Sequence, residues 1–294
     1  MKVRFIINSH AGRSGKLRRL SEAVRKTLQH ESGIFEIKAA ADREHAARLS
    51  AEAAEKNYEV VFACGGDGTI NSIAGPLVGT ETALGILPAG SGNALAASLN
   101  IPFDLDGAIG LLKSGRIRAM DVGMACGRYF FSTAGFAFEA HLSRRYDDGR
   151  LSSRIRGIAP YFPLALLEYF RFRPGEVVLT VDGSAIEGTP LLLTAANTGH
   201  FGGNAVIAPQ ARMDDGLLDF VFIPKTNILG ALSLGLKLYR GAIASHKGLR
   251  SVRGKKALIR GRNMGAVHVD GEPFEWEGDI EVSILPGMIR VLTP

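Results

Sequence analysis

Two short apolar runs, each ending in a glycine-rich loop, lie close together between residues 60 and 99. The first run, Val60–Cys64, stops at two glycines, and the second, Ala83–Leu87, stops at the loop Pro88–Asn93. Continuous apolar runs of this length are typical of parallel strands that are buried on both faces. Apolar residues at helical spacing predict a helix from about Thr69 and another over Ala94–Leu99. The stretch therefore predicts two adjacent parallel strands of an open α/β sheet.

The two glycine loops form the candidate nucleotide-binding site. Backbone N–H groups at the start of a helix bind anions, and neighbouring glycines let a phosphate approach the main chain closely. Open α/β sheets bind nucleotides at the edge where such loops meet. Asp67 in the first loop would repel a phosphate unless it holds a bridging cation or accepts a proton from a substrate hydroxyl. A single loop of this kind would also suit a tight turn, but two at this spacing favour phosphate binding.

Residues 65–69, GGDGT, and 88–93, PAGSGN, resemble the catalytic-domain superfamily of diacylglycerol kinases, sphingosine and ceramide kinases and bacterial multi-substrate lipid kinases. The second loop is most similar to the sphingosine kinase version. Diacylglycerol kinases more often have an aspartate where this chain has Ala94 and an arginine where it has Ala97. Further matches occur in family order, so the resemblance covers nearly the whole chain; they lie at residues 8–12, 121–123, 215–216 and 270–272.

The resemblance implies that ATP binds to three loops of the N-terminal half. The loop after the N-terminal strand, which contains Asn8, Gly12 and Lys16, departs from the family pattern, because Ser9 stands where a proline is usual. Relatives often place a threonine near the adenine or ribose where this chain has Ala39–Ala41. For Lys16, an ordinary charge on a solvated turn stays the alternative. The implied nucleotide-binding residues are Asn8, Gly12, Lys16, Gly65, Gly66, Gly68, Thr69, Asn71, Gly90, Ser91, Gly92 and Asn93.

Carboxylates at two places are candidate ligands of a divalent cation. Asp67 and Asp121 are both expected at the nucleotide crevice, and they could share Mg²⁺ through water, since this ion uses only one or two carboxylates. The segment PQARMDDGLLD resembles a turn that binds a structural Mg²⁺ in bacterial relatives. By that likeness the ligands would be the side chain of Asp215 and the carbonyl oxygens of Arg212 and Leu217. An Asp-Gly hairpin turn needs no metal, so both alternatives stay open.

The tripeptide Asp270-Gly271-Glu272 near the C-terminus resembles the Asp-Gly-Glu motif of the same family. Its Asp-Gly pair by itself predicts a hairpin turn. The resemblance implies that Glu272 is the general base that takes the proton from a lipid hydroxyl, with Asp67 as the second catalytic residue. Phosphoryl transfer depends mainly on positioning and charge stabilisation, so Mg²⁺, glycine-loop amides and such a base would be a sufficient set.

The hydrophobic pattern changes near Met124, where helical periodicity gives way to short β-rich runs. We expect an α/β nucleotide-binding domain over residues 1–123, a β-rich lipid or substrate domain over 124–285, and a tail, 286–294, that returns to the first domain. The fold class is α/β plus all-β, a Rossmann-like open sheet followed by a β-sandwich, with the nucleotide between the two domains. The strands expected in the second domain are Tyr129–Thr133, Val177–Val181, Leu191–Ala196, Leu217–Ile223, Lys256–Arg260, Gly265–Val269 and Ile280–Ile284.

A helical insertion over residues 142–174 interrupts the β-rich domain. Arginines flank its apolar and aromatic segment, Ile158–Leu167, and such a basic collar suits an element that meets anionic lipid headgroups. A helix that packs between domains and exposes a basic face is the alternative. The arginines are Arg144, Arg145, Arg150, Arg154, Arg156, Arg171 and Arg173.

Charge and cysteine content limit the partners and the compartment. The net charge of +6 suits an anionic partner, but no zinc-type spacing, helix-turn-helix signature or aromatic-interleaved basic stripe supports nucleic acid. Two cysteines, Cys64 and Cys126, indicate a reducing compartment. The N-terminus predicts a strand and not a signal peptide, and no stretch is apolar enough to span a membrane. We expect a cytoplasmic protein with peripheral membrane contact, and a homodimer is left open.

Together these patterns predict an ATP- and Mg²⁺-dependent lipid kinase. The lipid is either diacylglycerol or a sphingoid long-chain base. The second glycine loop favours the sphingoid base, whereas the chain length and the Asp-Gly-Glu turn favour diacylglycerol. An NAD kinase is an alternative, since it shares the Gly-Gly-Asp-Gly loop, although Asn71 is followed by Ser72 and not by glutamate. A catalytically weak nucleotide- or lipid-binding regulator is another, because Ser72, Ala94 and Ala97 replace expected polar groups.

Overall fold

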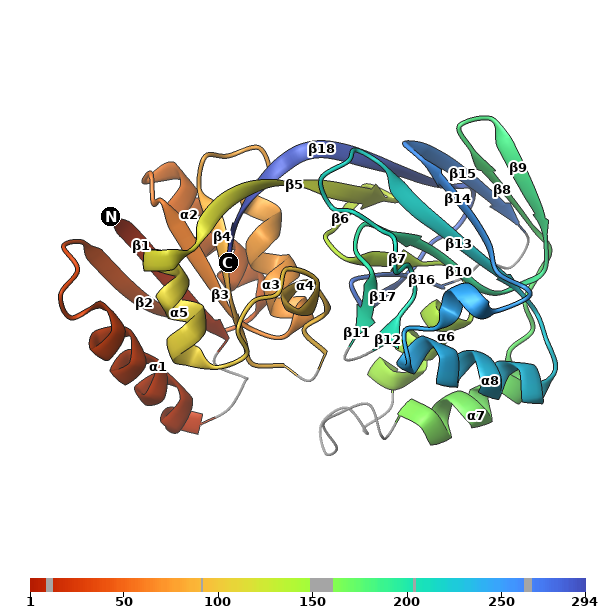
Figure 1. Ribbon diagram of the computed structural model, residues 1–294, viewed down its shortest axis with the longest axis horizontal. Helices are drawn as coiled ribbons and strands as arrows, with labels where there is room; N and C mark the ends of the chain where they lie inside the picture. Colours follow the sequence, from red (N-terminus) through yellow and green to blue (C-terminus); the bar gives the residue numbers. More distant parts are fainter. Residues whose placement is uncertain (9–12, 91, 149–160, 203–204, 262–265) are drawn as a thin grey trace. The chain divides into compact units, whose positions relative to one another are not determined.

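The computed structural model describes residues 1–8, 13–90, 92–148, 161–202, 205–261 and 266–294. The chain forms two compact units, and Figure 1 labels their helices and strands. The first unit is Met1–Met120 with Gly287–Pro294, and the second is Asp121–Pro286. The strands β5 (Arg116–Ala125) and β18 (Ile280–Thr293) each contain residues of both units.

The first unit contains an open parallel sheet in the order β2-β1-β3-β4. The end of β18 adds a further parallel strand, because Val291 pairs with Leu84 of β4. This sheet confirms the Rossmann-like arrangement that the sequence predicts. Its strands and helices are β1 (Lys2–Asn8), α1 (Arg13–Leu28), β2 (Ile34–Ala40), α2 (Arg43–Glu55), β3 (Val60–Gly65), α3 (Asp67–Ala74), η2 (Gly75–Leu77), β4 (Ala83–Pro88), α4 (Ala94–Ser98) and α5 (Leu105–Ser114).

Buried apolar packing holds the centre of this sheet together. Every residue of β3 is buried, as expected of a strand covered on both faces. The rings of Phe5 and Phe62 stack with centroids 4.8 Å apart, and Gly85 leaves room for them because a Cβ there would lie 2.7 Å from the Phe62 ring. Asp42 caps α2, since its Oδ1 accepts the N–H of His45 at 2.7 Å.

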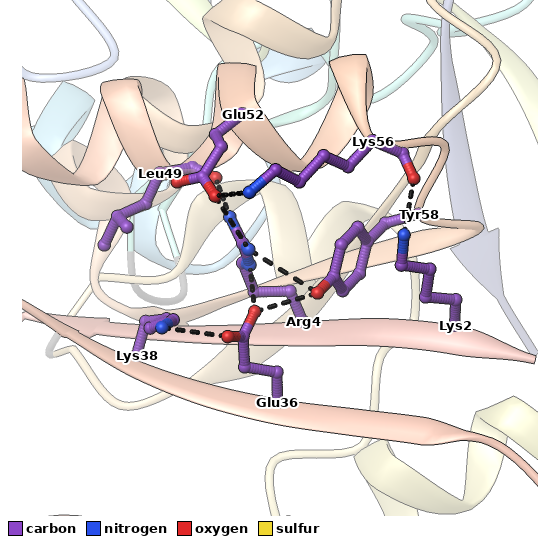
Figure 2. Close-up of polar contacts among 8 residues, drawn as sticks. All are labelled: Lys2, Arg4, Glu36, Lys38, Leu49, Glu52, Lys56 and Tyr58. Atoms are coloured by element: carbon purple, nitrogen blue, oxygen red, sulfur yellow. Dashed lines mark hydrogen bonds and ion pairs between the residues drawn. The ribbon is translucent and has the colours of Figure 1, made fainter.

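A buried arginine links β1, β2 and α2 in the first unit. Figure 2 shows Arg4 at the centre of this network. Only 1% of the surface of Arg4 is exposed. Its Nε donates to Oε2 of Glu36 at 2.7 Å, and one guanidinium nitrogen donates to the carbonyl oxygen of Leu49 at 2.8 Å. Burial alone would raise the pKa of Glu36, but hydrogen bonds from Lys38, Tyr58 and Arg4 outweigh it and lower the pKa to about 2. The ion pair therefore stays formed at neutral pH.

The second unit is a β-sandwich, as the sequence predicts. One sheet has the order β14-β13-β10-β7-β16-β17, and the other contains β18, β15, β8 and β9, with β5 and β6 attached through β18. Apolar residues from both sheets form one core, including Phe220, Leu193 and Ile259. The strands are β6 (Arg128–Phe130), β7 (Thr133–Gly135), β8 (Val177–Val181), β9 (Ser184–Gly188), β10 (Pro190–Ala196), β11 (His200–Gly202), β12 (Ala205–Val206), β13 (Leu218–Pro224), β14 (Arg250–Gly254), β15 (Lys256–Gly261), β16 (Ala266–Val269) and β17 (Glu272–Glu275).

Helices accompany the sandwich, so the second unit is not built of strands alone. The predicted insertion contains most of α6 (Phe138–Asp148) and all of α7 (Tyr161–Arg171), and its residues 149–160 lie outside the described ranges. The sequence pattern missed α8 (Ile228–Tyr239), which is followed by η3 (Ile243–Ser245). A second apolar cluster joins β10 and β13 to α8 through Leu234. Among the described residues, no helix combines the length and apolarity needed to cross a bilayer.

Candidate active site

The two glycine loops of the first unit lie against each other at the carboxyl ends of β3 and β4. The N–H of Ala89 donates to the carbonyl oxygen of Gly65 at 2.8 Å, which continues the β3–β4 pairing into the loops. Gly66 and Gly90 pack backbone against backbone, because a Cβ built on Gly90 would lie 2.5 Å from the Cα of Gly66. Glycine at position 90 is therefore required by the approach of the loops.

Asp67 joins these loops through hydrogen bonds to the main chain. Its Oδ2 accepts the N–H of Asn93 and its Oδ1 accepts the N–H of Ala94, both at 2.8 Å. These donors lie at the start of α4, so the carboxylate satisfies N–H groups that the helix itself leaves without an acceptor. A Cβ on Gly92 would lie 2.5 Å from Oδ2, so this carboxylate also explains a glycine of the second loop. The contacts give Asp67 a structural role that the sequence did not show, and its metal and catalytic roles stay predictions.

Asn93 shapes the second loop from within. Its φ is 51°, in the left-handed region that asparagine adopts more readily than most residues. Its Nδ2 donates to the carbonyl oxygen of Gly90 at 2.8 Å, and its Oδ1 accepts the N–H of Gly90 at 3.2 Å. Because the side chain is buried and serves the loop, Asn93 fixes the backbone around Gly90. A direct contact of Asn93 with nucleotide stays a prediction.

The first loop leads directly into α3. The initial N–H groups of a helix have no acceptor within the helix, so this start is suited to an anion. Thr69 covers Gly65, where a Cβ would lie 2.6 Å from the Cβ of Thr69. The carbonyl oxygen of Gly68 accepts the hydroxyl of Ser72 at 2.9 Å, and Asn71 lies half-buried on the same helix. These residues combine a helix start with glycines, which fits the phosphates of a nucleotide.

The other predicted nucleotide residues are described in part or not at all. The strand β1 ends at Asn8, which pairs with Ala40 of β2, and Lys16 belongs to α1. Gly12 and Ser91 lie outside the described residues. The structure thus brings together the residues of the two glycine loops, and the contribution of the loop after β1 to nucleotide binding stays a prediction.

In the second unit, Asp121 fixes the turn that contains Asp215 and Gly216. Its Oδ2 accepts the N–H of Gly216 at 2.7 Å, and its own N–H donates to the carbonyl oxygen of Met213 at 2.8 Å. Asp121 is buried, so these bonds compensate for the loss of water around its carboxylate. Its predicted share in a Mg²⁺ site with Asp67, a residue of the first unit, stays a prediction.

Arg253 contacts Asp215, the one carboxylate of the predicted structural metal site, and the neighbouring Asp219. Arg253 forms ion pairs with Asp215 and, at 3.4 Å, with Asp219. The Oδ1 of Asp215 accepts the N–H of Leu217 at 3.1 Å, and Arg212 pairs with Asp214. In the part of the chain that the structure describes, no group of three or more His, Cys, Asp or Glu side chains could hold a metal ion. The turn is closed by backbone bonds and a guanidinium, and its metal ligation stays a prediction.

Asp270 anchors the hairpin that carries Glu272. The turn joins β16 to β17 with φ angles of 49° at Asp270 and 84° at Gly271, which confirms the predicted hairpin. The Asp270 carboxylate accepts three backbone N–H groups from consecutive residues, Phe131, Ser132 and Thr133, at 2.8 to 3.1 Å. Glu272 is the first residue of β17 and is half-buried. The anchored turn gives Glu272 a fixed backbone, and its role as a base stays a prediction.

Next to this hairpin lies a buried histidine that the sequence analysis missed. His268 belongs to β16, and its Nδ1 accepts the N–H of Gly271 at 3.2 Å. Burial lowers the pKa of His268 to about 4, so the ring is neutral at pH 7 and carries its proton on Nε2. A histidine two residues before an Asp-Gly turn is a weak signal, because only the folded hairpin shows that its ring meets the turn.

A buried glutamate on α6 contacts the neighbouring strands. The Oε1 of Glu139 accepts the N–H groups of Phe136 and Leu193 at 3.2 and 3.1 Å and the hydroxyl of Thr194 at 3.1 Å. Burial raises the pKa of Glu139 to about 7 despite these hydrogen bonds. Glu139 and His268 both pack on Gly135, where a Cβ would lie 2.4 Å from Cγ of the glutamate and 2.2 Å from Nε2 of the histidine. A lone acid in an apolar run could have indicated this position.

Both units match models of known families. Residues 2–125 match the diacylglycerol kinase catalytic domain, and residues 133–293 match the YegS C-terminal NAD kinase beta sandwich-like domain. The second match alone covers more than half of the chain. The protein therefore belongs to the diacylglycerol kinase catalytic-domain superfamily, whose members include lipid kinases.

Individual relatives agree with this assignment. The chain is 27% identical over 276 residues to a diacylglycerol kinase of Bacillus subtilis, covering 92% of this chain and 89% of the relative. It is 27% identical over 300 residues to a diacylglycerol kinase of Mycobacterium tuberculosis, covering 100% and 95%. A Bacillus anthracis structure provisionally called a diacylglycerol kinase superposes with a TM-score of 0.82 at 20% identity, over 100% of this chain and 95% of that one, which supports the fold.

Proposed function

We propose that the protein is a lipid kinase that transfers the γ-phosphate of ATP to a lipid hydroxyl. Diacylglycerol is the first acceptor to consider, since it is named in the relatives, and a sphingoid long-chain base is the second. The observation that carries the proposal is the backbone contact between Gly66 and Gly90 beside the start of α3. This arrangement offers main-chain N–H groups to a phosphate without side chains in the way.

The side chains of the loops hold this main chain in place before a nucleotide binds. Asp67 and Asn93 are occupied by backbone groups of the loops, so they preorganise donors instead of competing for them. A donor set made of N–H groups suits phosphate oxygens and does not suit a metal ion. Mg²⁺, when bound with ATP, would supply charge neutralisation on the phosphates.

Glu272 is the proposed general base. Its carboxylate would accept the proton of the lipid hydroxyl while the hydroxyl oxygen forms a bond to the γ-phosphorus and the bond from this phosphorus to the bridging oxygen of ADP breaks. Asp270 supports this role, because its three backbone hydrogen bonds fix the turn directly before Glu272. The anchoring would limit the freedom of the base. Less conformational entropy would then be lost when the base reaches the reactive geometry.

The experiment is a transfer assay with Mg²⁺ and γ-labelled ATP. The acceptors are mixed micelles of diacylglycerol, sphingosine, dihydrosphingosine, ceramide, monoacylglycerol or phosphatidylglycerol, with NAD as a separate acceptor. We expect one labelled lipid, and we expect Glu272→Gln to lower kcat by about 100-fold or more while leaving the affinity for an ATP analogue unchanged.

Glu277→Gln is the matched control. Glu277 is an exposed glutamate shortly after β17, so its neutralisation changes the net charge equally without touching the proposed base. We expect full activity from this variant. Equal activity of the two variants would refute the role of Glu272, labelled NAD would favour an NAD kinase, and ATP binding without any labelled product would favour a regulator.

A further inference from the structure

The helix α8 of the second unit is apolar on two opposite faces. One face carries Leu234, which is buried in the cluster that joins the helix to the sandwich. The other face is exposed to solvent, and its large side chains recur at helical spacing. These are Leu229, Leu232, Leu236 and Tyr239, with 73%, 38%, 49% and 54% of their surface exposed. A helix that is apolar all round is normally covered on both sides, so the exposed face lacks the environment that its composition requires.

The helix α7 adds exposed apolar residues close to the start of α8. The hydroxyl of Tyr169 on α7 donates to the carbonyl oxygen of Thr226, directly before the Asn227 cap of α8, and Tyr169 packs on the same cluster as Leu234. Figure 1 shows the two helices at the same end of the second unit. Among the described side chains of α7, the exposed large apolar ones are Leu166, Leu167 and Phe170, with 38%, 50% and 59% of their surface exposed. We refer to these three residues and the four of α8 as the apolar face.

The charge around the apolar face has one sign over a long stretch of sequence. From Phe220 to Val269, which includes all of α8, the chain contains no aspartate or glutamate. Lys225 precedes α8 and Arg240 follows it, and both are exposed. The basic residues of the stretch are Lys225, Lys237, Arg240, Lys247, Arg250, Arg253, Lys255, Lys256, Arg260 and Arg262. An apolar face with cations at both ends of its helix matches the surface of an anionic bilayer, where acyl chains lie beneath negative headgroups.

We propose that the apolar face of α7 and α8 docks the protein on the surface of an anionic lipid bilayer. The inference deepens the proposed lipid kinase function, because an enzyme whose acceptor is a lipid must reach it in a membrane. The charge complementarity selects the bilayer over a second copy of this chain, whose equally basic helix ends would repel each other.

The test is sedimentation of the full chain with vesicles, which needs no catalysis. Wild type should bind vesicles of phosphatidylcholine with phosphatidylglycerol and bind pure phosphatidylcholine vesicles much more weakly. The variant Leu232→Ser/Leu236→Ser should bind roughly tenfold to hundredfold more weakly, because the exposed parts of the two side chains together amount to about one leucine. Lys225→Glu/Arg240→Glu should weaken binding to the anionic vesicles and reduce its dependence on salt.

Ile34→Ser/Phe103→Ser is the matched control. Both residues are 59% exposed and lie in the first unit, away from α7 and α8 in the sequence. This variant should bind vesicles as wild type does. Equal loss in the control and the α8 variant, no loss in the α8 variant, or equal binding to neutral vesicles would overturn the inference.

Two further measurements keep the outcomes distinct. Circular dichroism melting checks that the variants are folded, and a replacement of Leu229 and Tyr239 by serine provides a second α8 variant if the first is not. Sedimentation velocity tests self-association, and a dimer that the α8 variant abolishes, without vesicle binding, would overturn the inference. Transfer in detergent micelles without vesicle binding would refute the docking face alone, whereas vesicle binding without transfer to any acceptor would refute the proposed function alone.

Discussion

The contact between the two glycine loops can be tested by replacing Gly90 with alanine. The new Cβ would lie 2.5 Å from the Cα of Gly66, whereas ordinary contact begins at 3.4 Å, so the two backbones must separate by about 0.9 Å. Neither partner is a flexible side chain that could swing aside. Overpacking of this kind costs about 1–3 kcal/mol, and a displacement near 1 Å in a positioning element lowers rates on the order of 100-fold. We expect kcat/KM for ATP to fall by about 100-fold.

The assay compares kcat/KM for ATP and the Kd of a non-hydrolysable ATP analogue. The matched control is Gly110→Ala in α5, another glycine of the first unit, where a Cβ would meet nothing within 4 Å. In a helix interior alanine is favoured over glycine by about 1 kcal/mol, so this variant should be at least as stable as wild type and fully active. The pair therefore separates the effect of the loop contact from the effect of adding a methyl group.

A Gly90→Ala protein with kcat/KM within threefold of wild type would refute the reasoning. That result would mean that the loops can separate without disturbing the phosphate-binding backbone. Equal losses in the two alanine variants would also contradict it, because Gly110 has no close neighbour to displace.

Three further variants test individual contacts. Asp67→Asn leaves one acceptor where two N–H groups of α4 bind, so ATP affinity by calorimetry should fall at least tenfold, and an unchanged affinity would contradict this. Glu36→Gln should lower the free energy of unfolding by about 2–3 kcal/mol at pH 7, measured by hydrogen exchange in β1 and β2. Because the pKa of Glu36 is about 2 in the folded protein, the difference in stability between wild type and this variant should shrink as the pH falls from about 4.5 to 2. Burial raises the pKa of Glu139 to about 7, so the contribution of this group to the stability of wild type should be greatest below about pH 4.5 and fall by up to about 3 kcal/mol as the pH rises to 7 and above. Glu139→Gln should not show this loss in urea unfolding at pH 5 and pH 8, and parallel curves for the two proteins would contradict the assignment.

The first unit follows its sequence closely, because its signals are local. The uninterrupted apolar run at Val60–Cys64 predicts a buried strand, and β3 is buried throughout. A cap such as Asp42 acts within three residues of itself, so the start of α2 can also be predicted. By contrast, α8 has apolar residues on two faces, and the absence of a one-sided stripe removed the periodicity by which it could have been recognised.

The site residues were predicted by motif, but their contacts were not. Nothing in the tripeptide around Asp67 shows that its oxygens bind N–H groups 26 and 27 residues away. The same holds for Asp270, whose partners lie 137 to 139 residues earlier in the chain. His268 and Glu139 meet at Gly135 only because β7, β16 and α6 come together in the fold. Motifs identify such residues by type, whereas their hydrogen-bond partners follow from tertiary structure.

The contacts of the loops also bear on how a nucleotide would be recognised. Two polar side chains of the loops, Asp67 and Asn93, bind main-chain groups, so they fix a backbone whose N–H donors a ligand can use. Such donors match phosphate oxygens and carry no information about the base. At the end of β2 the chain has three consecutive alanines, Ala39–Ala41, which cannot hydrogen-bond a base or ribose through their side chains. On the proposed function, the described part of the first unit therefore selects for the phosphate chain of the nucleotide more strongly than for adenine.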